Sequence, residues 1–314
     1  MTKRRPSIGV FDSGVGGLTV LKSLVSRIPD ADYVYFGDTA RLPYGSKSAE
    51  TVAHYAVGAA HYLQQAGVQM LVIACNTATA LALDEIRKAS PVPVIGVIEP
   101  GAHAAAHATR NKKVIVIGTD ATVRSHAYHR ALEALGIEAR EKACPLFVPL
   151  VEEGWTDHTV TEQVARIYLG EAFANEFSEA DVLVLGCTHY PLIQPLLRRV
   201  APEHVTIVDS ADSTAEAVAR QLVIEPLVPS QQEDVERRAQ TRLQFFATDS
   251  PEKFRALGER FLARPGECGP RASQGIGLCF GNAPTQRFSS ARLTALQDIP
   301  TKKKRPRIAA VIGS

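Results

Sequence analysis

Short apolar runs rich in β-branched residues recur along the chain, separated by longer amphipathic stretches. The runs are "SIGVF", "YVYF", "MLVIA", "VPVIGVI", "KVIVIG", "DVLVLG", "VTIVD" and "RLQFFA". Continuous apolar runs of this length are typical of strands buried on both faces, as in parallel sheets. The alternation therefore predicts an α/β protein whose mainly parallel sheets are flanked by helices.

Capping residues and glycines predict where several helices begin and end. Ser48 can cap a helix over residues 49–65, which Gly67 would end, and Asp157 can cap a second helix over residues 158–173. Gly136 closes a third helical pattern, which begins near Ala121. These signals place helices between the apolar runs, as an α/β fold requires.

A weak internal repeat in the sequence predicts two similar domains. Asp12, in "IGVFDSGVGG", precedes Cys75 by 63 positions, and Thr119, in "IVIGTDATVRS", precedes Cys187 by 68. Ligands gather at the carboxyl ends of parallel strands, so two halves that face each other would bring both cysteines to one cleft. Because unrelated α/β segments also look alike, the pattern by itself leaves this open. We predict a first domain over residues 1–98 plus 208–265 and a second over 99–207.

The positive charge of the chain is concentrated in its last segment. Residues 266–314 hold eight Lys/Arg and two Asp/Glu, whereas the rest holds 27 Lys/Arg and 31 Asp/Glu. The body therefore has no electrostatic footprint for nucleic acid. The segment 266–314 has no sustained periodicity and several Gly, Pro and Ser, so we expect an irregular, mobile basic tail that is a solvated end.

Apolar segments and cysteine spacing restrict the class of protein further. No run approaches the roughly 20 apolar residues of a membrane span, and the N-terminal region lacks the apolar stretch of a signal peptide. We expect a cytoplasmic protein without a membrane partner. The five cysteines form no CxxC pair, which argues against a zinc ribbon or a disulfide framework and predicts free thiols. Of these, Cys144 reads as core, and Cys268 and Cys279 lie in the tail.

Two cysteines occupy the same local setting. In "LVIACNTATA" and "VLVLGCTHYP", an apolar run stops at a small residue and is followed by Cys75 or Cys187 and then by polar residues. At a strand-to-helix turn, free backbone N–H groups and the helix dipole favour a thiolate. Free cysteine more often only packs, so either one alone would be a weak candidate. Their repetition favours chemistry.

Other polar residues near strand ends have a functional and a structural interpretation. The loop after Asp12 is glycine-rich and could hold an anion, but it lacks the third glycine of the dinucleotide fingerprint, and a tight turn is the alternative. Tyr44 and Gly45 could contact a polar ligand or only form a turn. His189 could assist Cys187 or satisfy a carbonyl group, and Glu152 could pair with His189 or lie on the surface.

Four segments carry a family resemblance. "GVFDSGVGGLTV", "YFGDTARLPYGSKS", "ACNTATA" and "GCTHYPLI" resemble, in order, the signature segments of the glutamate racemase family, over about residues 7 to 264. The resemblance implies that Cys75 and Cys187 are the acid–base pair, which Asp12 and His189 would assist. It also implies that a shared set of residues holds the substrate: Asp12, Ser13, Tyr44, Gly45, Asn76, Thr77, Thr119, Thr122, Thr188 and His189. The chain departs from the family after Pro265, where 49 further residues put the usual last strand in doubt.

The resemblance implies a racemase that interconverts L- and D-glutamate, with no cofactor and no metal, and supplies D-glutamate for peptidoglycan synthesis. It implies a small-molecule substrate, with a homodimer as the expected assembly. Three rivals stay open: an aspartate racemase or other small-acid isomerase on the same scaffold, a non-catalytic regulator that keeps the fold, and a thiol redox protein. The last is disfavoured because no second cysteine lies near either Cys75 or Cys187 in sequence.

Overall fold

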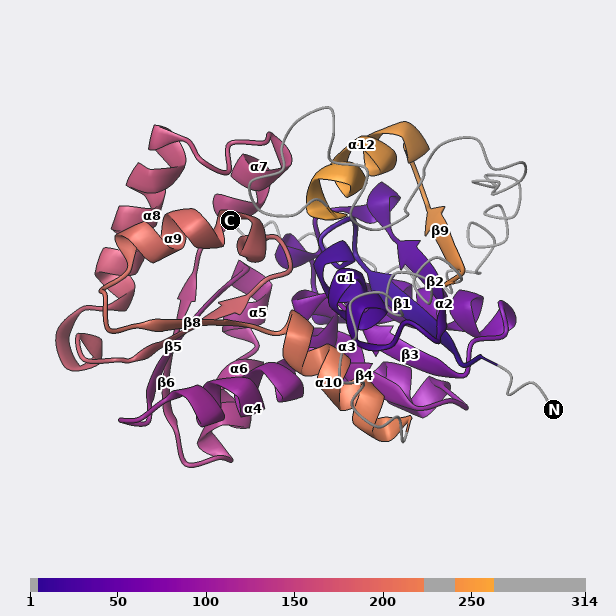
Figure 1. Ribbon diagram of the computed structural model, residues 1–314, viewed down its shortest axis with the longest axis horizontal. Helices are drawn as coiled ribbons and strands as arrows, with labels where there is room; N and C mark the ends of the chain where they lie inside the picture. The colour runs from indigo at the N-terminus through magenta and orange to yellow at the C-terminus, as the bar shows by residue number, and fades with distance from the viewer. Residues whose placement is uncertain (1–4, 223–240, 263–314) are drawn as a thin grey trace, which may run out of the picture.

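Two separate parallel sheets form the centre of the molecule (Figure 1). The computed structural model describes residues 5–222 and 241–262. The first sheet contains β1 (Ser7–Asp12), β2 (Asp32–Gly37), β3 (Met70–Ile73), β4 (Val94–Gly96) and β9 (Leu243–Ala247). The second contains β5 (Lys113–Gly118), β6 (Glu138–Ala143), β7 (Val182–Gly186) and β8 (Thr206–Asp209). All pairings between these strands are parallel, which confirms the predicted fold class.

The two sheets share one strand order, which explains the weak internal repeat in the sequence. The first sheet runs β4-β3-β1-β2, and β9 extends it beyond β2. The second, read from its other edge, runs β8-β7-β5-β6. Each strand of the second sheet thus occupies the place of the strand four earlier in the first. As a result, β3, which leads to Cys75, and β7, which leads to Cys187, hold equivalent positions.

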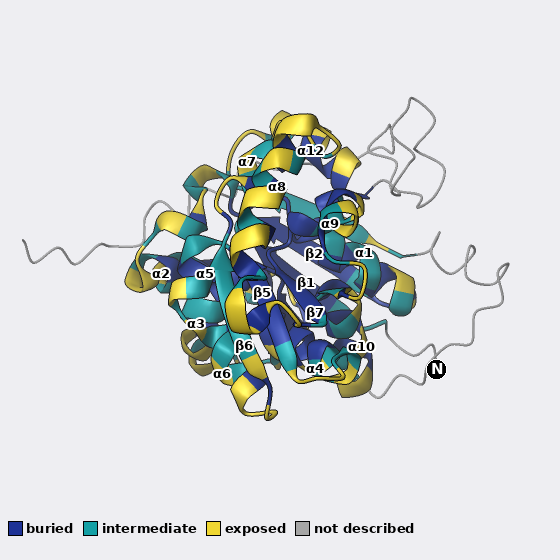
Figure 2. Ribbon diagram, turned by 90° about the vertical axis from the view of Figure 1, so that its left-hand side faces the viewer, coloured by how far each residue is buried: buried dark blue, intermediate teal, exposed yellow. Residues whose placement is uncertain are grey.

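Helices pack on both faces of each sheet and bury the central strands, which appear dark blue in Figure 2. The longer ones are α1 (Leu18–Arg27), α2 (Ala49–Gln65), α3 (Asn76–Ala89), α4 (Ile98–Ala108), α8 (Thr159–Ala172), α10 (Ala211–Gln221) and α12 (Pro251–Leu262). The shorter ones are α5 (Asp120–Arg124), α6 (Ala127–Glu133), α7 (Phe147–Glu152) and α9 (Gln194–Val200). No helix among these described residues is long and apolar enough to span a membrane.

The structure confirms one predicted cap and corrects another. Ser48 caps α2 by accepting a hydrogen bond from the Thr51 N–H, and Gly67 follows the helix with φ of +82°, which glycine adopts without strain. At α8 the capping residue is His158 rather than Asp157, since its side chain accepts from the Val160 N–H. Asp157 instead forms an ion pair with Arg199.

The sequence signals miss a strand and merge two helices. β6 ("EAREKA") is an edge strand with charged, partly exposed residues, so it lacks the apolar run that marked the other strands. The helical pattern from Ala121 to Gly136 is divided between α5 and α6, because the backbone at His126 turns to φ of +54°.

The proposed domain boundaries stay predictions, but the sheets bear on one of them. The boundary between residues 207 and 208 falls inside β8, which pairs with β7 through Asp209, so the second sheet extends past it. The predicted tail 266–314, with Cys268 and Cys279, lies outside the described residues. Cys144 is fully buried in the core, as predicted.

Candidate active site

Asp12, the last residue of β1, begins the site. Its carboxylate is buried, and Oδ2 accepts a hydrogen bond from the Gly14 N–H at 2.8 Å. Its other oxygen, Oδ1, is buried without a hydrogen-bond partner among the described residues. A buried carboxylate oxygen of this kind is costly unless a ligand group satisfies it. Asp12 is therefore placed to accept from a bound cation or N–H donor.

Cys75 follows β3 and caps the N-terminus of α3. Its Sγ accepts from the Ala78 N–H at 3.4 Å and lies 3.3 Å from Ser13 Oγ. Parallel register explains the meeting with the first loop, because Phe11 of β1 pairs with Ile73 of β3, so both strands end at the same edge. The free N–H groups at the start of α3 support negative charge there, as the sequence pattern predicts.

Cys187 follows β7 in a different setting from the one predicted. It leads into a short 3₁₀ turn, Tyr190–Ile193, rather than directly into an α-helix. Its charge partner is a side chain: Sγ lies 4.0 Å from His189 Nδ1, and His189 Nε2 lies 3.2 Å from Glu152 Oε1. The two cysteines are thus supported by different means, one by a helix N-terminus and one by a His–Glu pair.

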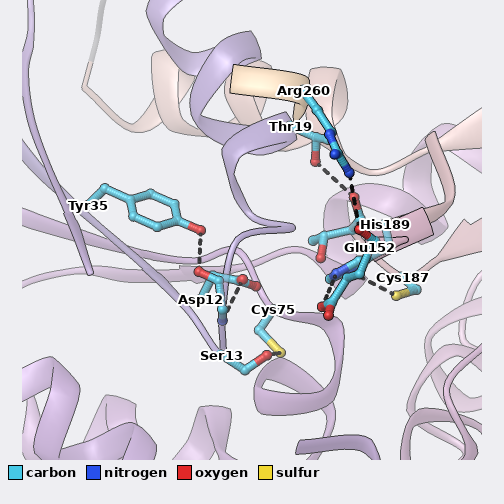
Figure 3. A network of polar contacts seen from close by, with 11 residues as sticks. Asp12, Ser13, Thr19, Tyr35, Cys75, Glu152, Cys187, His189 and Arg260 are labelled. Carbon is cyan, nitrogen blue, oxygen red and sulfur yellow. Dashed lines mark hydrogen bonds and ion pairs between the residues drawn. The ribbon is translucent and has the colours of Figure 1, made fainter. Parts of the chain in front are cut away.

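The glycine-rich loop joins the two half-sites. A Cβ atom added at Gly16 would overlap Thr188 Oγ1 and lie 2.6 Å from His189 Nδ1. One at Gly17 would lie 2.6 Å from the Cβ of Asp12. Glycine is required here because two chain segments approach closely, not because of an anion fingerprint. Figure 3 shows the result: Asp12, Ser13 and Cys75 lie together on one side, and the Cys187–His189–Glu152 group lies on the other.

Hydroxyl and amide groups from both halves form the rest of the site. Thr77 Oγ1, on α3, lies 2.9 Å from Thr119 Oγ1 and 3.2 Å from Thr122 Oγ1, both on the second half. Asn76 Oδ1 accepts from the Tyr128 hydroxyl at 2.8 Å, which leaves its buried Nδ2 without a partner among the described residues. This amide can donate to an anion. Thr122 is fully buried, and its hydroxyl lies close enough to those of Thr77 and Thr119 to position both; its predicted contact with the substrate stays a prediction.

Tyr44 and Gly45 reach the site from the loop after β2. The Tyr44 hydroxyl donates to Asp38 Oδ2 at 2.7 Å, and a Cβ on Gly45 would lie 3.1 Å from Thr119 Cβ. Asp38 is buried and also accepts from Arg41, at 2.7 Å. Asp38 therefore fixes the shape of this loop, and Gly45 brings the loop against Thr119 of the second half. The sequence analysis missed this role of Asp38.

Burial and neighbouring charges set the protonation states. Burial, together with the Asp12 carboxylate, raises the pKa of Cys75 to about 12, so the free protein holds it as a thiol. Burial also raises the pKa of Asp12, which the charge at His189 opposes. For His189, burial lowers the pKa, but the contacts with Cys187 and Glu152 outweigh it and raise the pKa to about 10. A protonated His189 stabilises negative charge on Cys187.

The His189–Glu152 pair predicts a pH-dependent contribution to stability. The hydrogen bond from His189 lowers the pKa of Glu152 below its usual 4.5, so this stabilisation is present above pH 4.5 and is lost as pH falls through the lowered value. The pKa of His189 is raised above 6.5, so its stabilisation is complete below pH 6.5 and is lost as pH rises toward about 10. Both contributions are complete between pH 4.5 and 6.5. The Glu152→Gln variant should therefore be most destabilised, relative to the native protein, in that range.

Urea unfolding at about pH 5.5, 7.5 and 9.5 measures this difference, which should shrink toward pH 9.5. The matched control is Glu162→Gln, which removes a more exposed ion pair with Arg166 and should change stability by only about 0.5 kcal/mol or less. A difference for Glu152→Gln that stays constant over the three pH values would contradict the assigned pair.

The sequence analysis missed two residues that support the site. Tyr128 is remote from the motifs, and only the fold brings its hydroxyl to Asn76. Asp38 was detectable, because it follows the end of β2 as Asp12 ends β1.

Among the described residues, no group of three His, Cys, Asp or Glu could hold a metal ion. The arrangement offers two thiols, one from each half of the molecule, with a carboxylate beside Cys75 and hydroxyl and amide groups around them.

Comparison with known proteins gives a consistent result. Residues 8–218 match the family described as Asp/Glu/Hydantoin racemase. The glutamate racemase of Koribacter versatilis is 59% identical, over 84% of this chain and 96% of that protein, and that of Geobacter metallireducens is 47% identical, over 82% and 92%. The crystal structure of a Francisella tularensis glutamate racemase in complex with D-glutamate is similar, with a TM-score of 0.71 and 36% identity over 82% of this chain and 93% of that one.

Proposed function

The chain belongs to the Asp/Glu/Hydantoin racemase family, and on that premise we propose that it interconverts L- and D-glutamate by proton transfer between Cys75 and Cys187. The observation that supports this proposal is that two thiol-bearing strand ends face one site, Cys75 beside Ser13 and Cys187 beside His189 (Figure 3). The relatives that are glutamate racemases support glutamate as the substrate.

Inversion of an α-carbon requires a proton to leave one face and another to arrive on the opposite face. A single base cannot reach both faces unless the substrate turns over, so two groups on opposite walls suit the reaction. In the direction from L to D, the Cys187 thiolate takes the α-proton and the Cys75 thiol donates its own proton to the other face. Cys187 ends as the thiol and Cys75 as the thiolate, and the reverse direction exchanges these roles. The direction assigned to each cysteine rests on the family resemblance.

Negative charge on the carbanion must be stabilised between two buried thiols. The substrate ammonium would lie beside Asp12, whose Oδ1 has no hydrogen-bond partner in the described part of the chain, and would favour both the carbanion and a thiolate at Cys75. The substrate carboxylates would accept from the Asn76 amide and from nearby hydroxyl groups. Those hydroxyls belong to Ser13, Thr77, Thr119 and Thr188.

Circular dichroism tests the activity directly. L-Glutamate incubated with the purified protein and no added cofactor should lose its signal, and D-glutamate should lose an equal and opposite one. L-Aspartate serves as the parallel substrate. Faster loss of the aspartate signal would favour the rival aspartate racemase, and no loss with either amino acid would favour a non-catalytic regulator.

Asp12→Asn and His189→Asn should each lower kcat by about 10²-fold, because each removes the group that supports one proton transfer. L- and D-glutamate have equal free energy in water, so kcat/KM must fall equally in both directions. The separate kcat values should change unequally, with Asp12 affecting the Cys75 side and His189 the Cys187 side. Initial rates from each enantiomer measure this. Unchanged forward and reverse kcat in both variants would refute these roles.

The same proposal extends to the cellular role. D-Glutamate made in the cytoplasm would supply peptidoglycan synthesis, as the family resemblance implies. The expected homodimer stays a prediction, since the structure contains one chain.

A further inference from the structure

The helix α12 lies at the junction of the two half-sites, although it comes from the end of the described chain. In Figure 1 it lies above α1 and beside α7, the helix that carries Glu152. Its buried side chains belong to the same core as Cys187. The sequence motifs and the proposed chemistry assign no role to this helix.

One end of α12 contacts the His189–Glu152 pair. The Phe261 ring lies 5.2 Å from the His189 ring, centroid to centroid, at an interplanar angle of 84°. Both residues are buried, and Arg260 Nη1 donates to the Glu152 carbonyl oxygen at 3.2 Å (Figure 3). Edge-to-face packing of this kind restricts rotation of the imidazole away from Cys187 and Glu152.

The other end of α12 contacts the support of Asp12. The Phe254 ring lies 5.8 Å from the Tyr35 ring. The Tyr35 hydroxyl donates to the Gly14 carbonyl oxygen at 3.1 Å, and the Gly14 N–H donates to Asp12 Oδ2 at 2.8 Å. Phe254 thus acts on Asp12 through two intermediates, Tyr35 and Gly14, whereas the ring contact of His189 is with Phe261.

We propose that Phe261 and Phe254 are positioning residues, each for one of the two proton transfers. Phe261 holds His189 toward Cys187, and Phe254 holds the Gly14 turn that orients Asp12 beside Cys75. One helix thereby aligns both sides of the reaction. This inference rests on the proposed racemase function and on its assignment of Cys187 to L-glutamate and Cys75 to D-glutamate.

Substrate isotope effects distinguish this role from a merely structural one. In the Phe261→Leu variant, transfer to and from Cys187 should slow, and kcat should fall by about 3- to 30-fold. With α-deuterated L-glutamate the isotope effect on kcat should rise, since removal of the deuteron by Cys187 becomes more limiting. With α-deuterated D-glutamate it should fall, since reprotonation by Cys187, with a proton from solvent, becomes limiting instead.

The Phe254→Leu variant should shift the two isotope effects in the opposite sense, because it weakens the Cys75 side. The matched control is Phe177→Leu, which changes a buried phenylalanine packed against Arg140, away from the site. It should lower stability but leave both isotope effects at the native values. Thermal unfolding of each variant shows that the comparison is made on folded protein.

Two failures can be separated. If the native protein does not racemise glutamate, the proposed function itself is wrong. Suppose instead that the native protein is active, but that Phe261→Leu and Phe254→Leu each change both isotope effects in the same direction. In that case α12 only supports the core. Isotope effects that do not change in either variant overturn the positioning role as well.

Discussion

Replacing either Cys75 or Cys187 by serine should lower the rate of racemisation by about 10²–10⁴-fold, or about 3–5 kcal/mol of activation free energy, with the fold intact. Serine keeps the approximate size of the side chain, but its hydroxyl is a far weaker acid than a thiol. It therefore does not form the anion that would act as the base. Each cysteine acts in both directions, once as base and once as acid. Either substitution should therefore lower both forward and reverse rates.

Proton NMR of glutamate in heavy water measures this loss, because each inversion in the native protein should place a solvent deuteron at the α-carbon. The matched control is Cys144→Ser, in which serine can retain the contact that Sγ makes with the Lys142 carbonyl oxygen, 3.7 Å away. Cys144 is fully buried outside the site, so this variant should keep most of the native rate. Normal racemisation by either Cys75→Ser or Cys187→Ser would refute the two-thiol pair.

Gly16→Ala should lower kcat/KM by at least about 10²-fold, although it adds only one methyl group. The new Cβ would overlap Thr188 Oγ1 and lie 2.6 Å from His189 Nδ1, so the loop or the His189 side chain must move. Displacement of catalytic groups by about 1 Å can reduce rates by two orders of magnitude. Initial rates and thermal unfolding of the purified variant separate this effect from loss of the fold.

Gly170→Ala provides the control for the same substitution. Gly170 lies within α8, and no atom lies within 4 Å of a Cβ added there. Alanine in this position should raise stability by about 0.5–1 kcal/mol and leave activity unchanged. A Gly16→Ala variant with native kcat/KM would show that the close approach of the two loops is not needed for activity.

The strand ends that carry chemistry were predictable because polar residues interrupt apolar runs there. Asp12, Cys75 and Cys187 were all found in this way, and the parallel pairing of β1 with β3 places Asp12 and Cys75 together at the carboxyl ends of these strands. The same criterion failed for β6, whose charged residues lie at the edge of a sheet and need no apolar run. Helix caps were predicted less well, since His158 rather than Asp157 supplies the acceptor at α8.

By itself, the sequence determined the α/β class and the residue types that can exchange a proton, because apolar period and strand-end polarity are local properties. The equivalence of the two halves, which the sequence left open, was established by the shared strand order of the two sheets. Tertiary structure decided how each thiol is supported. Only the fold brings Glu152 to His189, Ser13 to Cys75 and Phe261 onto the His189 ring, since these partners lie between 37 and 72 positions apart. Such contacts depend on how the two sheets and a helix from the end of the described chain pack together. A local pattern of residues does not encode this packing.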